Sequence, residues 1–221
     1  MGSDLAAEKR DAARRSVELI ENDMVVGLGS GTTAAIVVEV IGERIKSGLR
    51  IRAISSSSET ARLAKAAGIA LIDFEMVEAI DLTIDGADEI DPEGRMIKGR
   101  GGALLYEKIL ASTSRKLVIA ADSTKSVARL GGRCPVPVEV IPLATPIVTR
   151  TLKAMARSVR LRLNADGVPC VTDEGNHILD CDFGLIAAPE ELAARLDGMV
   201  GVVEHGLFIG FAPKLIVGRA D

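Results

Sequence analysis

Residues 24–34 read MVVGLGSGTTA, and this stretch sets the pattern of the fold. The apolar run at its start predicts a short buried strand, and residues 34–45 continue with helical spacing. Between them lies a glycine-rich turn. A strand, such a turn and a helix in this order direct backbone N–H groups and a helix N-terminus toward an anion. The turn's candidate ligands for a phosphate group are Ser30, Gly31, Thr32 and Thr33.

The turn differs from the two best-known nucleotide-binding loops. It lacks the lysine of a nucleoside triphosphate loop, and Thr33 stands where a dinucleotide fingerprint would have its last glycine. No acidic residue ends the predicted second strand near Ile54, where it could bind a ribose hydroxyl. A phosphate monoester is therefore the favoured ligand. A tight strand-to-helix turn with a threonine cap and no ligand remains the alternative.

Strands and helices alternate on both sides of this stretch. The pattern predicts helices at 4–20 and 59–67 and strands at 51–54, 69–72, 82–84 and 116–121. Alternation of this kind predicts a parallel sheet with right-handed crossovers, flanked by helices, in a Rossmann-like α/β fold. Ligands of such sheets bind at the carboxyl ends of the strands. The loops 30–33 and 55–58, Asp85 and the loop 122–125 should therefore meet at one edge.

The pattern changes near residue 130, where four prolines follow within a short distance. Beyond them we expect a smaller inserted α+β domain at 130–203, with residues 1–129 and 204–221 forming the Rossmann-like catalytic domain. The tail, 206–219, should rejoin that first domain. The elements expected in the insert are helices at 146–156 and 189–196 and strands at 158–163, 169–173, 177–182 and 199–203.

Composition excludes several classes of protein. The 221-residue chain is 48% apolar but only 2% aromatic, so its core is expected to consist of small aliphatic side chains. A net charge of −4 gives no basis for general nucleic-acid binding, and no apolar run has the length of a membrane span. The three cysteines are sparse and form no motif typical of a metal site, and the N-terminus carries no apolar signal segment. These two features predict a cytoplasmic protein with reduced thiols.

The segment from Asp85 to Glu107 gathers most of the chemically useful side chains. Asp85 and Asp88 follow a predicted strand, and two close carboxylates can share acid and base duties or bind a divalent cation. Lys98 precedes a glycine-rich turn, and an ammonium group with exposed N–H groups suits a developing oxyanion. Because Lys98 and Lys125 already supply positive charge, no metal is expected. Helix capping and a basic surface turn are the structural alternatives.

Glu107 is notable for its neighbours. The residues three and four positions away on either side are all apolar, so this carboxylate should face the buried side of its helix and could act as a general base. The alternative is an ion pair with Arg115 or Lys108. The basic residues of the first helix, among them Lys9 and Arg10, are interpreted as a solvated face rather than as part of an anion site.

Four blocks of this sequence closely resemble ribose-5-phosphate isomerase type A. They read GLGSGTTA at 27–34, DGADEI at 85–90, KGRGGALLYEKI at 98–109 and PVPVEV at 135–140. Their order and spacing match, and the resemblance covers nearly the whole chain. The sequence departs from the family at Arg100, where many members have glycine, and in the first loop, where the order of the hydroxyl residues differs.

The resemblance implies interconversion of D-ribose 5-phosphate and D-ribulose 5-phosphate, with no metal and no cofactor. It implies that Glu107 moves a proton between C1 and C2 through a cis-enediol, and that Asp85, Asp88 and Lys98 assist ring opening and hold substrate oxygens. Lys9 is a weaker match to a lysine near the phosphate. A homodimer or homotetramer is expected. The substrate-binding candidates are Ser30, Gly31, Thr32, Thr33, Asp85, Gly86, Ala87, Asp88, Lys98, Gly99, Arg100, Gly101 and Lys125.

Two other functions remain as alternatives. One is an acyl-CoA transferase-like enzyme on a related fold, in which Glu107 would be the nucleophile. The other is a non-catalytic sugar-phosphate sensor, although the chain leaves no room for an added DNA-binding module.

Overall fold

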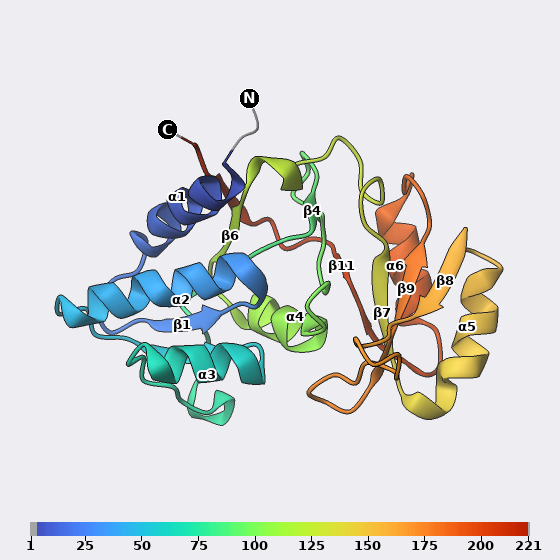
Figure 1. Cartoon of the computed structure of the whole chain (residues 1–221), viewed down its shortest axis with the longest axis horizontal. Helices are drawn as coiled ribbons and strands as arrows, with labels where there is room; N and C mark the ends of the chain where they lie inside the picture. The colour runs from blue at the N-terminus through green and yellow to red at the C-terminus, as the bar shows by residue number, and fades with distance from the viewer. Residues whose placement is uncertain (1–3, 221) are drawn as a thin grey trace. The chain divides into compact units, whose positions relative to one another are not determined.

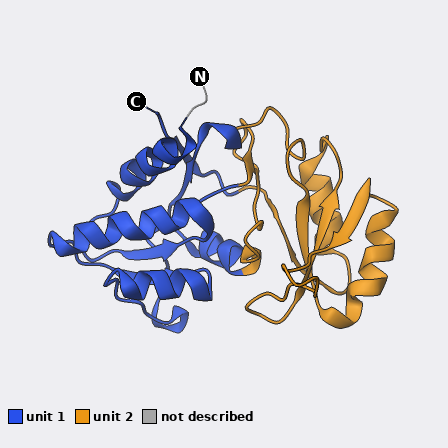
Figure 2. Ribbon diagram, viewed as in Figure 1, with its two compact units in different colours: residues 1–87, 106–125, 211–221 blue, residues 88–105, 126–210 orange. Residues whose placement is uncertain are grey.

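Five parallel strands, in the order β12-β6-β3-β1-β2, form the sheet of the first of two units, and Figure 1 labels β1 and β6 among them. A computed structural model describes residues 4–220. The first unit comprises residues 4–87, 106–125 and 211–220, and the second unit comprises residues 88–105 and 126–210 (Figure 2). The strands are β1 (Val25–Leu28), β2 (Arg52–Ser55), β3 (Leu82–Asp85), β6 (Leu117–Ala121) and β12 (Lys214–Val217). The helices are α1 (Leu5–Val17), α2 (Gly31–Lys46), α3 (Ser58–Ala66), most of α4 (Leu104–Thr113), and the short η1 (Phe74–Met76) and η2 (Ser123–Lys125).

Helices cover both faces of this sheet because its strands are apolar on both sides. Val26 of β1 packs in one core with Val37 and Ile41 of α2, and residues of α1 complete this layer. Val25 points to the opposite face and packs with Leu110 of α4. The predicted α/β class with a parallel sheet is therefore confirmed. No helix within residues 4–220 is both long enough and apolar enough to cross a bilayer.

The strand predicted at 69–72 is wrong. Only an isolated parallel bridge forms there, between Ala53 and Leu71. The segment is too short to extend a ladder, because α3 ends just before Gly68 and η1 begins at Phe74. The fifth strand is β12 from the tail of the chain, which pairs in parallel with β6.

The second unit contains two antiparallel sheets. A four-stranded sheet has the order β10-β7-β9-β8 and a three-stranded one the order β11-β5-β4. These strands are β4 (Glu89–Ile90), β5 (Met96–Ile97), β7 (Val136–Val140), β8 (Ser158–Leu161), β9 (His177–Asp182), β10 (Val202–His205) and β11 (Leu207–Phe208). The helices are η3 (Pro142–Ala144), α5 (Thr145–Lys153) and α6 (Pro189–Asp197).

Three expectations for this half of the chain differ from the structure. No strand forms at 169–173, where only two isolated bridges occur. The strand expected at 199–203 is shifted and forms at Val202–His205. The first part of the tail does not rejoin the parallel sheet, because Leu207 and Phe208 pair with β5 in the second unit. The domain boundaries expected from the sequence, at 130 and 203, stay a prediction.

Strand β7 was not expected, because its Pro137 lies in what proves to be an inner strand. Proline lacks the N–H needed for a ladder and is normally found at sheet edges. Here the Pro137 oxygen accepts the Gly206 N–H at 2.7 Å. The nitrogen and oxygen of one strand residue point to the same side. The missing N–H therefore faces the Gly206 segment, beyond the end of the β7–β10 ladder.

Glu139 of β7 is a fully buried carboxylate with unequally bonded oxygens. Its Oε1 accepts hydrogen bonds from Thr172 Oγ1 at 2.9 Å and Asn176 Nδ2 at 3.0 Å. Its Oε2 has no hydrogen-bond partner among residues 4–220. Burial raises the pKa of Glu139, and the nearby charges of Glu174 and Glu204 add to the rise, whereas the two hydrogen bonds oppose it.

Replacing Glu139 with Gln should raise the free energy of unfolding by about 1 kcal/mol at about pH 8, because the buried charge is removed. A raised folded-state pKa means that Glu139 contributes stability below its unfolded pKa and loses that contribution as pH rises through the folded pKa. The advantage of the Gln variant should therefore shrink toward about pH 5. Urea unfolding at both pH values measures this, with the exposed Glu191→Gln as control. An equal effect at both pH values would contradict the assignment.

Candidate active site

Polar segments follow the carboxyl ends of four neighbouring strands in the first unit. Strands β1, β2, β3 and β6 pair in parallel, so their carboxyl ends lie at one edge of the sheet. The loop Ser30–Thr33 follows β1, the serine run follows β2, Asp85 ends β3 and the segment 122–125 follows β6. The predicted meeting of these loops at one edge is therefore confirmed.

Ser30 connects the first loop to two carboxylates. Its backbone N–H donates to Asp85 Oδ1 at 3.2 Å, and its hydroxyl donates to Glu107 Oε1 at 2.5 Å. The Gly86 N–H also donates to Asp85 Oδ1, at 2.7 Å. Asp85 and Glu107 are 2% and 4% exposed, so both are held in a protected environment by short polar contacts. The structure thus brings together three residues predicted from the sequence. They are Asp85 at the end of β3, Ser30 in the loop before α2, and Glu107 in α4.

Two glycines make this approach feasible. A Cβ at Gly29 would lie 2.0 Å from Asp85 Oδ1, so a larger residue there would displace the carboxylate. Gly31 adopts a φ of +83°, which other residues rarely tolerate, and it begins α2. The glycines of the loop are therefore needed for close backbone approach and for the turn into the helix.

Glu107 faces the buried side of α4, as its apolar neighbours predict. Leu104, Leu110 and Ala111 are buried with it. Arg115, one of its suggested ion-pair partners, pairs with Asp81 at 3.2 Å. A buried carboxylate bonded to a serine hydroxyl is suited to accept a proton from a bound molecule.

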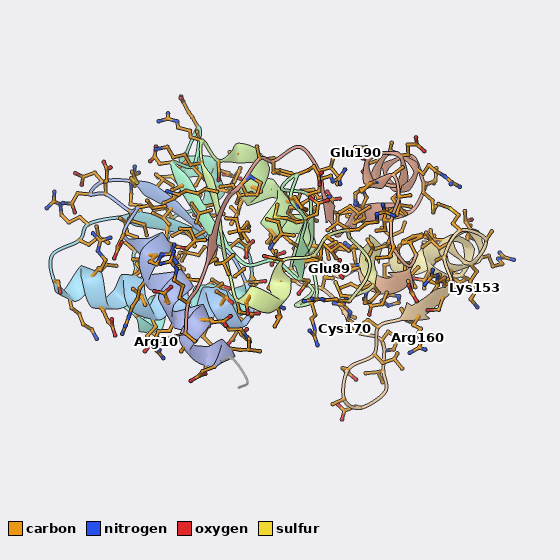
Figure 3. The ribbon with its side chains drawn as sticks, turned by 90° about the horizontal axis from the view of Figure 1, so that it is seen from above. Arg10, Glu89, Lys153, Arg160, Cys170 and Glu190 are labelled. Carbon is orange, nitrogen blue, oxygen red and sulfur yellow. The ribbon has the colours of Figure 1, made fainter. Side chains whose placement is uncertain are left out.

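Lys9 reaches the first loop, so its interpretation as part of a solvated face is wrong. Its Nζ donates to Thr32 Oγ1 at 3.2 Å and lies 3.9 Å from Asp122 Oδ2. The neighbouring Arg10 is exposed and pairs with Glu39 at 3.5 Å, as a solvated residue would (Figure 3). A charge run alone does not reveal which of its members turns inward.

The segment that carries Lys125 is held by buried acids. Asp122 is 2% exposed and accepts hydrogen bonds from the Thr124 N–H, at 3.0 Å, and from its hydroxyl. Glu8 of α1, also buried, accepts the Ser123 N–H at 2.7 Å. These contacts order the short helix η2, at whose end Lys125 lies half-buried. Glu8 was missed in the sequence, where nothing distinguished it from the other acids of α1.

Of the remaining predicted residues, Ala87 belongs to the first unit and the others, from Asp88 to Gly101, belong to the second. Lys98 follows β5 and is only 4% exposed. Its N–H donates to Gly206 O at 2.9 Å, and its Nζ lies 5.4 Å from the centroid of the Phe208 ring. This distance permits a cation–π interaction between the ammonium group and the ring. Both residues of the 206–208 segment therefore help to hold Lys98.

Asp88 and Arg100 are linked through the backbone. The Arg100 N–H donates to Asp88 Oδ2 at 3.0 Å, while the Asp88 N–H donates to Ile97 O at 2.8 Å. The Arg100 side chain, at the position where many family members have glycine, is exposed. In this structure its N–H is bonded to a carboxylate.

Two other acids in the same segment have structural roles. Glu89 is fully buried and accepts three backbone N–H groups, from Gly131, Arg133 and Cys134, at 2.6 to 2.9 Å. Asp91 is paired with Arg95 at 2.6 Å. Both carboxylates therefore hold loops of the second unit.

Cys181 and His205 are the buried cysteine and the buried histidine of the second unit. Burial raises the pKa of the Cys181 thiol to about 12, so it stays protonated. Asp197, Glu204 and His205 bring potential ligand atoms within 4.8 Å of one another. However, His205 Nδ1 accepts the Leu207 N–H, which places the proton on Nε2, the atom 3.0 Å from Asp197 Oδ1. This arrangement favours a hydrogen bond over a metal ligand.

The chain matches the family model described as ribose 5-phosphate isomerase A (phosphoriboisomerase A) over residues 52–221. It is 48% identical to ribose-5-phosphate isomerase A of Sphingopyxis alaskensis over 219 residues, which cover 99% of this chain and 95% of the relative. The corresponding protein of Gloeobacter violaceus is 50% identical over 97% of this chain and 93% of its own.

Solved structures give the same result. A D-ribose-5-phosphate isomerase in complex with phospho-erythronic acid superimposes with a TM-score of 0.95 at 36% identity, covering 99% of this chain and 96% of that chain. Ribose 5-phosphate isomerase A from Neisseria gonorrhoeae gives a TM-score of 0.88 at 37% identity, covering 96% and 92%. The predicted resemblance is confirmed: the chain belongs to the ribose 5-phosphate isomerase A family.

Proposed function

We propose that this protein interconverts D-ribose 5-phosphate and D-ribulose 5-phosphate. The observation that carries the proposal is the buried Glu107 carboxylate, bonded to Ser30 of a loop built to receive an anion. The family relationship over nearly the whole chain supports the same reaction. It gives no support to an acyl-CoA transferase or a sugar-phosphate sensor.

Glu107 is the proposed general base. In the open-chain aldose it would take the proton from C2, and the C1 carbonyl would become the second hydroxyl of a cis-enediol. Return of the proton to C1, with transfer of the O2 proton back to the acid group that had protonated O1, gives the ketose. One carboxylate can serve both steps because it alternates between base and acid.

The negative charge that develops on the substrate oxygens requires a positive partner. We assign this role to Lys98, with the N–H groups of Gly99 and Gly101 as further candidates. Lys98 is buried, which strengthens its electrostatic effect relative to an exposed lysine. Asp85 and Asp88 are assigned to the sugar hydroxyls and to opening of the furanose ring. The remaining substrate-binding candidates of these segments are Gly86, Ala87 and Arg100.

The phosphate group is assigned to the loop Ser30–Thr33. This loop begins the 16-residue helix α2, whose N-terminal N–H groups and dipole favour an anion. Lys9 contacts Thr32 of the loop, so it adds a positive charge beside it. Lys125 is a further candidate for this group.

An isomerase assay tests the proposed function directly. Purified protein with ribose 5-phosphate should form the ketose, and addition of EDTA should leave the rate unchanged, since the proposed steps use only side chains and backbone. Absence of ketose formation by the folded protein would overturn the proposal. We further propose that the enzyme is a homodimer or homotetramer acting in the cytoplasm, as its family resemblance implies.

A further inference from the structure

One arginine from a distant part of the sequence binds the carbonyl groups of the turn that follows Lys98. Arg162 Nη1 donates to Gly99 O at 2.9 Å and to Arg100 O at 3.0 Å. Arg162 lies just beyond the end of β8 in the same unit. The turn is therefore tied to the four-stranded sheet by side chain-to-backbone hydrogen bonds.

A carboxylate fixes the orientation of this arginine. Arg162 Nε and Nη2 donate to the two oxygens of Asp180 at 3.0 and 2.5 Å, which is the bidentate geometry that a guanidinium group favours. The two side chains are only 17% and 24% exposed. Asp180 lies in β9, where its backbone is paired with both β7 and β8. All three nitrogens of the guanidinium group are thus engaged, and the group has a single favourable orientation.

The turn requires such an anchor because its backbone is unusual. Gly99 and Gly102 have φ values of +98° and +84°, and a Cβ at Gly99 would lie 2.9 Å from Leu104 Cβ. No side chain could replace glycine at these two positions without strain, so they contribute no side-chain packing to the turn. Asp88 binds the Arg100 N–H, and Arg162 binds the Gly99 carbonyl of that same peptide group and the Arg100 carbonyl of the next one.

We infer that Arg162, oriented by Asp180, is a positioning residue that holds the Lys98–Gly102 turn in its active geometry. The inference rests on the proposed function, because it assumes that Lys98 and the turn's N–H groups act on the substrate. The hydrogen bonds of the Arg162 side chain go to the turn's carbonyl oxygens and to Asp180. Arg162 therefore acts indirectly, because it fixes the orientation of the turn's N–H groups. A displacement of about 1 Å in such groups can lower a rate about 100-fold.

The adjoining strand β8 provides a matched control. Arg160 lies two residues before Arg162, lines the same surface pocket, and has an exposed side chain (Figure 3). The structure shows no ion pair of Arg160 among residues 4–220. Replacement of Arg160 removes the same charge from the same pocket without removing the anchor. A general effect of charge would therefore appear in both variants, and an effect of the anchor in only one.

Steady-state kinetics and amide hydrogen exchange together test this inference. Arg162→Met should lower kcat about 100-fold, while Arg160→Met should stay within about 2-fold of the wild type. Arg162→Lys should have a kcat about 10-fold below that of the wild type, which is a smaller loss than in Arg162→Met. An ammonium group keeps the positive charge but cannot make the bidentate hydrogen bonds of a guanidinium group. Asp180→Asn should lower kcat by about 10-fold, since Arg162 remains but is less firmly oriented. Exchange of the amides at 99–102 should be faster in Arg162→Met and unchanged in Arg160→Met.

Each outcome decides the inference. Wild-type kcat together with wild-type exchange of the turn in Arg162→Met would overturn it, as would equal losses of kcat in Arg162→Met and Arg160→Met. If Arg162→Met does not fold, Arg162→Lys and Asp180→Asn give the same comparison, and wild-type kcat in both would overturn it. Failure of the proposed function would look different. The wild type itself would then form no ketose, whereas the exchange experiment would still report whether Arg162 holds the turn.

Discussion

Replacing Glu107 with Gln should lower kcat on the order of 10³-fold, which is within the range expected for loss of a general base. The amide oxygen of Gln can still accept the Ser30 hydroxyl, which donates to Glu107 at 2.5 Å in the native protein. The variant therefore keeps the shape and the main polar contact of the site. It loses only the ability to accept a proton at neutral pH, so KM should change little.

Two measurements separate this effect from damage to the fold. Calorimetric titration of Glu107→Gln with ribose 5-phosphate should give a dissociation constant within a few-fold of that of the wild type, because binding does not require the proton acceptor. Its thermal unfolding should also resemble that of the wild type. A variant that binds the substrate and still turns over at more than about half the native kcat would rule out Glu107 as the base.

Replacing Lys98 with Met should lower kcat by about 10²- to 10³-fold, the range found when one preorganised group that stabilises a developing oxyanion is removed. Methionine is close to lysine in length and can occupy the same buried position, 4% exposed, against Phe208. The loss should therefore come from the missing ammonium group and not from a cavity. Because this charge is needed most in the transition state, kcat should fall more than substrate affinity.

Lys153→Met is a matched control for this variant. Lys153 is an exposed residue at the end of α5 in the same unit (Figure 3). Its replacement changes the net charge equally, so kcat should stay within about 2-fold of the native value. A similar small effect of Lys98→Met would contradict the role assigned to Lys98.

The sequence predicted the parallel sheet well, because each of its inner strands is a compact apolar run next to a turn signal. β1, β3 and β6 all formed where the pattern placed them. The prediction failed where pairing between distant segments decides whether a strand forms. Residues 69–72 are as apolar as a strand but have too little length between α3 and η1 to form one. β12 joins the sheet only because the tail returns to β6, which periodicity cannot show.

Strand β7 shows a different limit. Pro137 argues against an inner strand, and the prediction accordingly treated this region as a boundary between domains. The structure accommodates the proline because its missing N–H lies beyond the end of one ladder, beside Gly206. Such a solution depends on a residue far along the chain and leaves no local signal.

The candidate site was predictable to the extent that its residues lie in recognisable local patterns. The burial of Glu107 follows from its apolar helical neighbours, and the approach of Ser30 to Asp85 follows from the layout of a parallel sheet. The prediction for Lys9 was wrong because the sequence does not show which of several basic residues on a helix has its side chain turned toward the protein. Arg162 and Asp180 were not singled out, because their link to the turn after Lys98 exists only in three dimensions.

The most direct test of the account follows the proton itself. In D₂O, proton NMR of ribulose 5-phosphate with the wild-type enzyme should show loss of one C1 proton signal, because the base that carries this proton can exchange it with solvent. Glu107→Gln should bind the ketose but leave that signal intact over the same time. Exchange at C1 by Glu107→Gln at the wild-type rate would contradict the claim that Glu107 moves the proton.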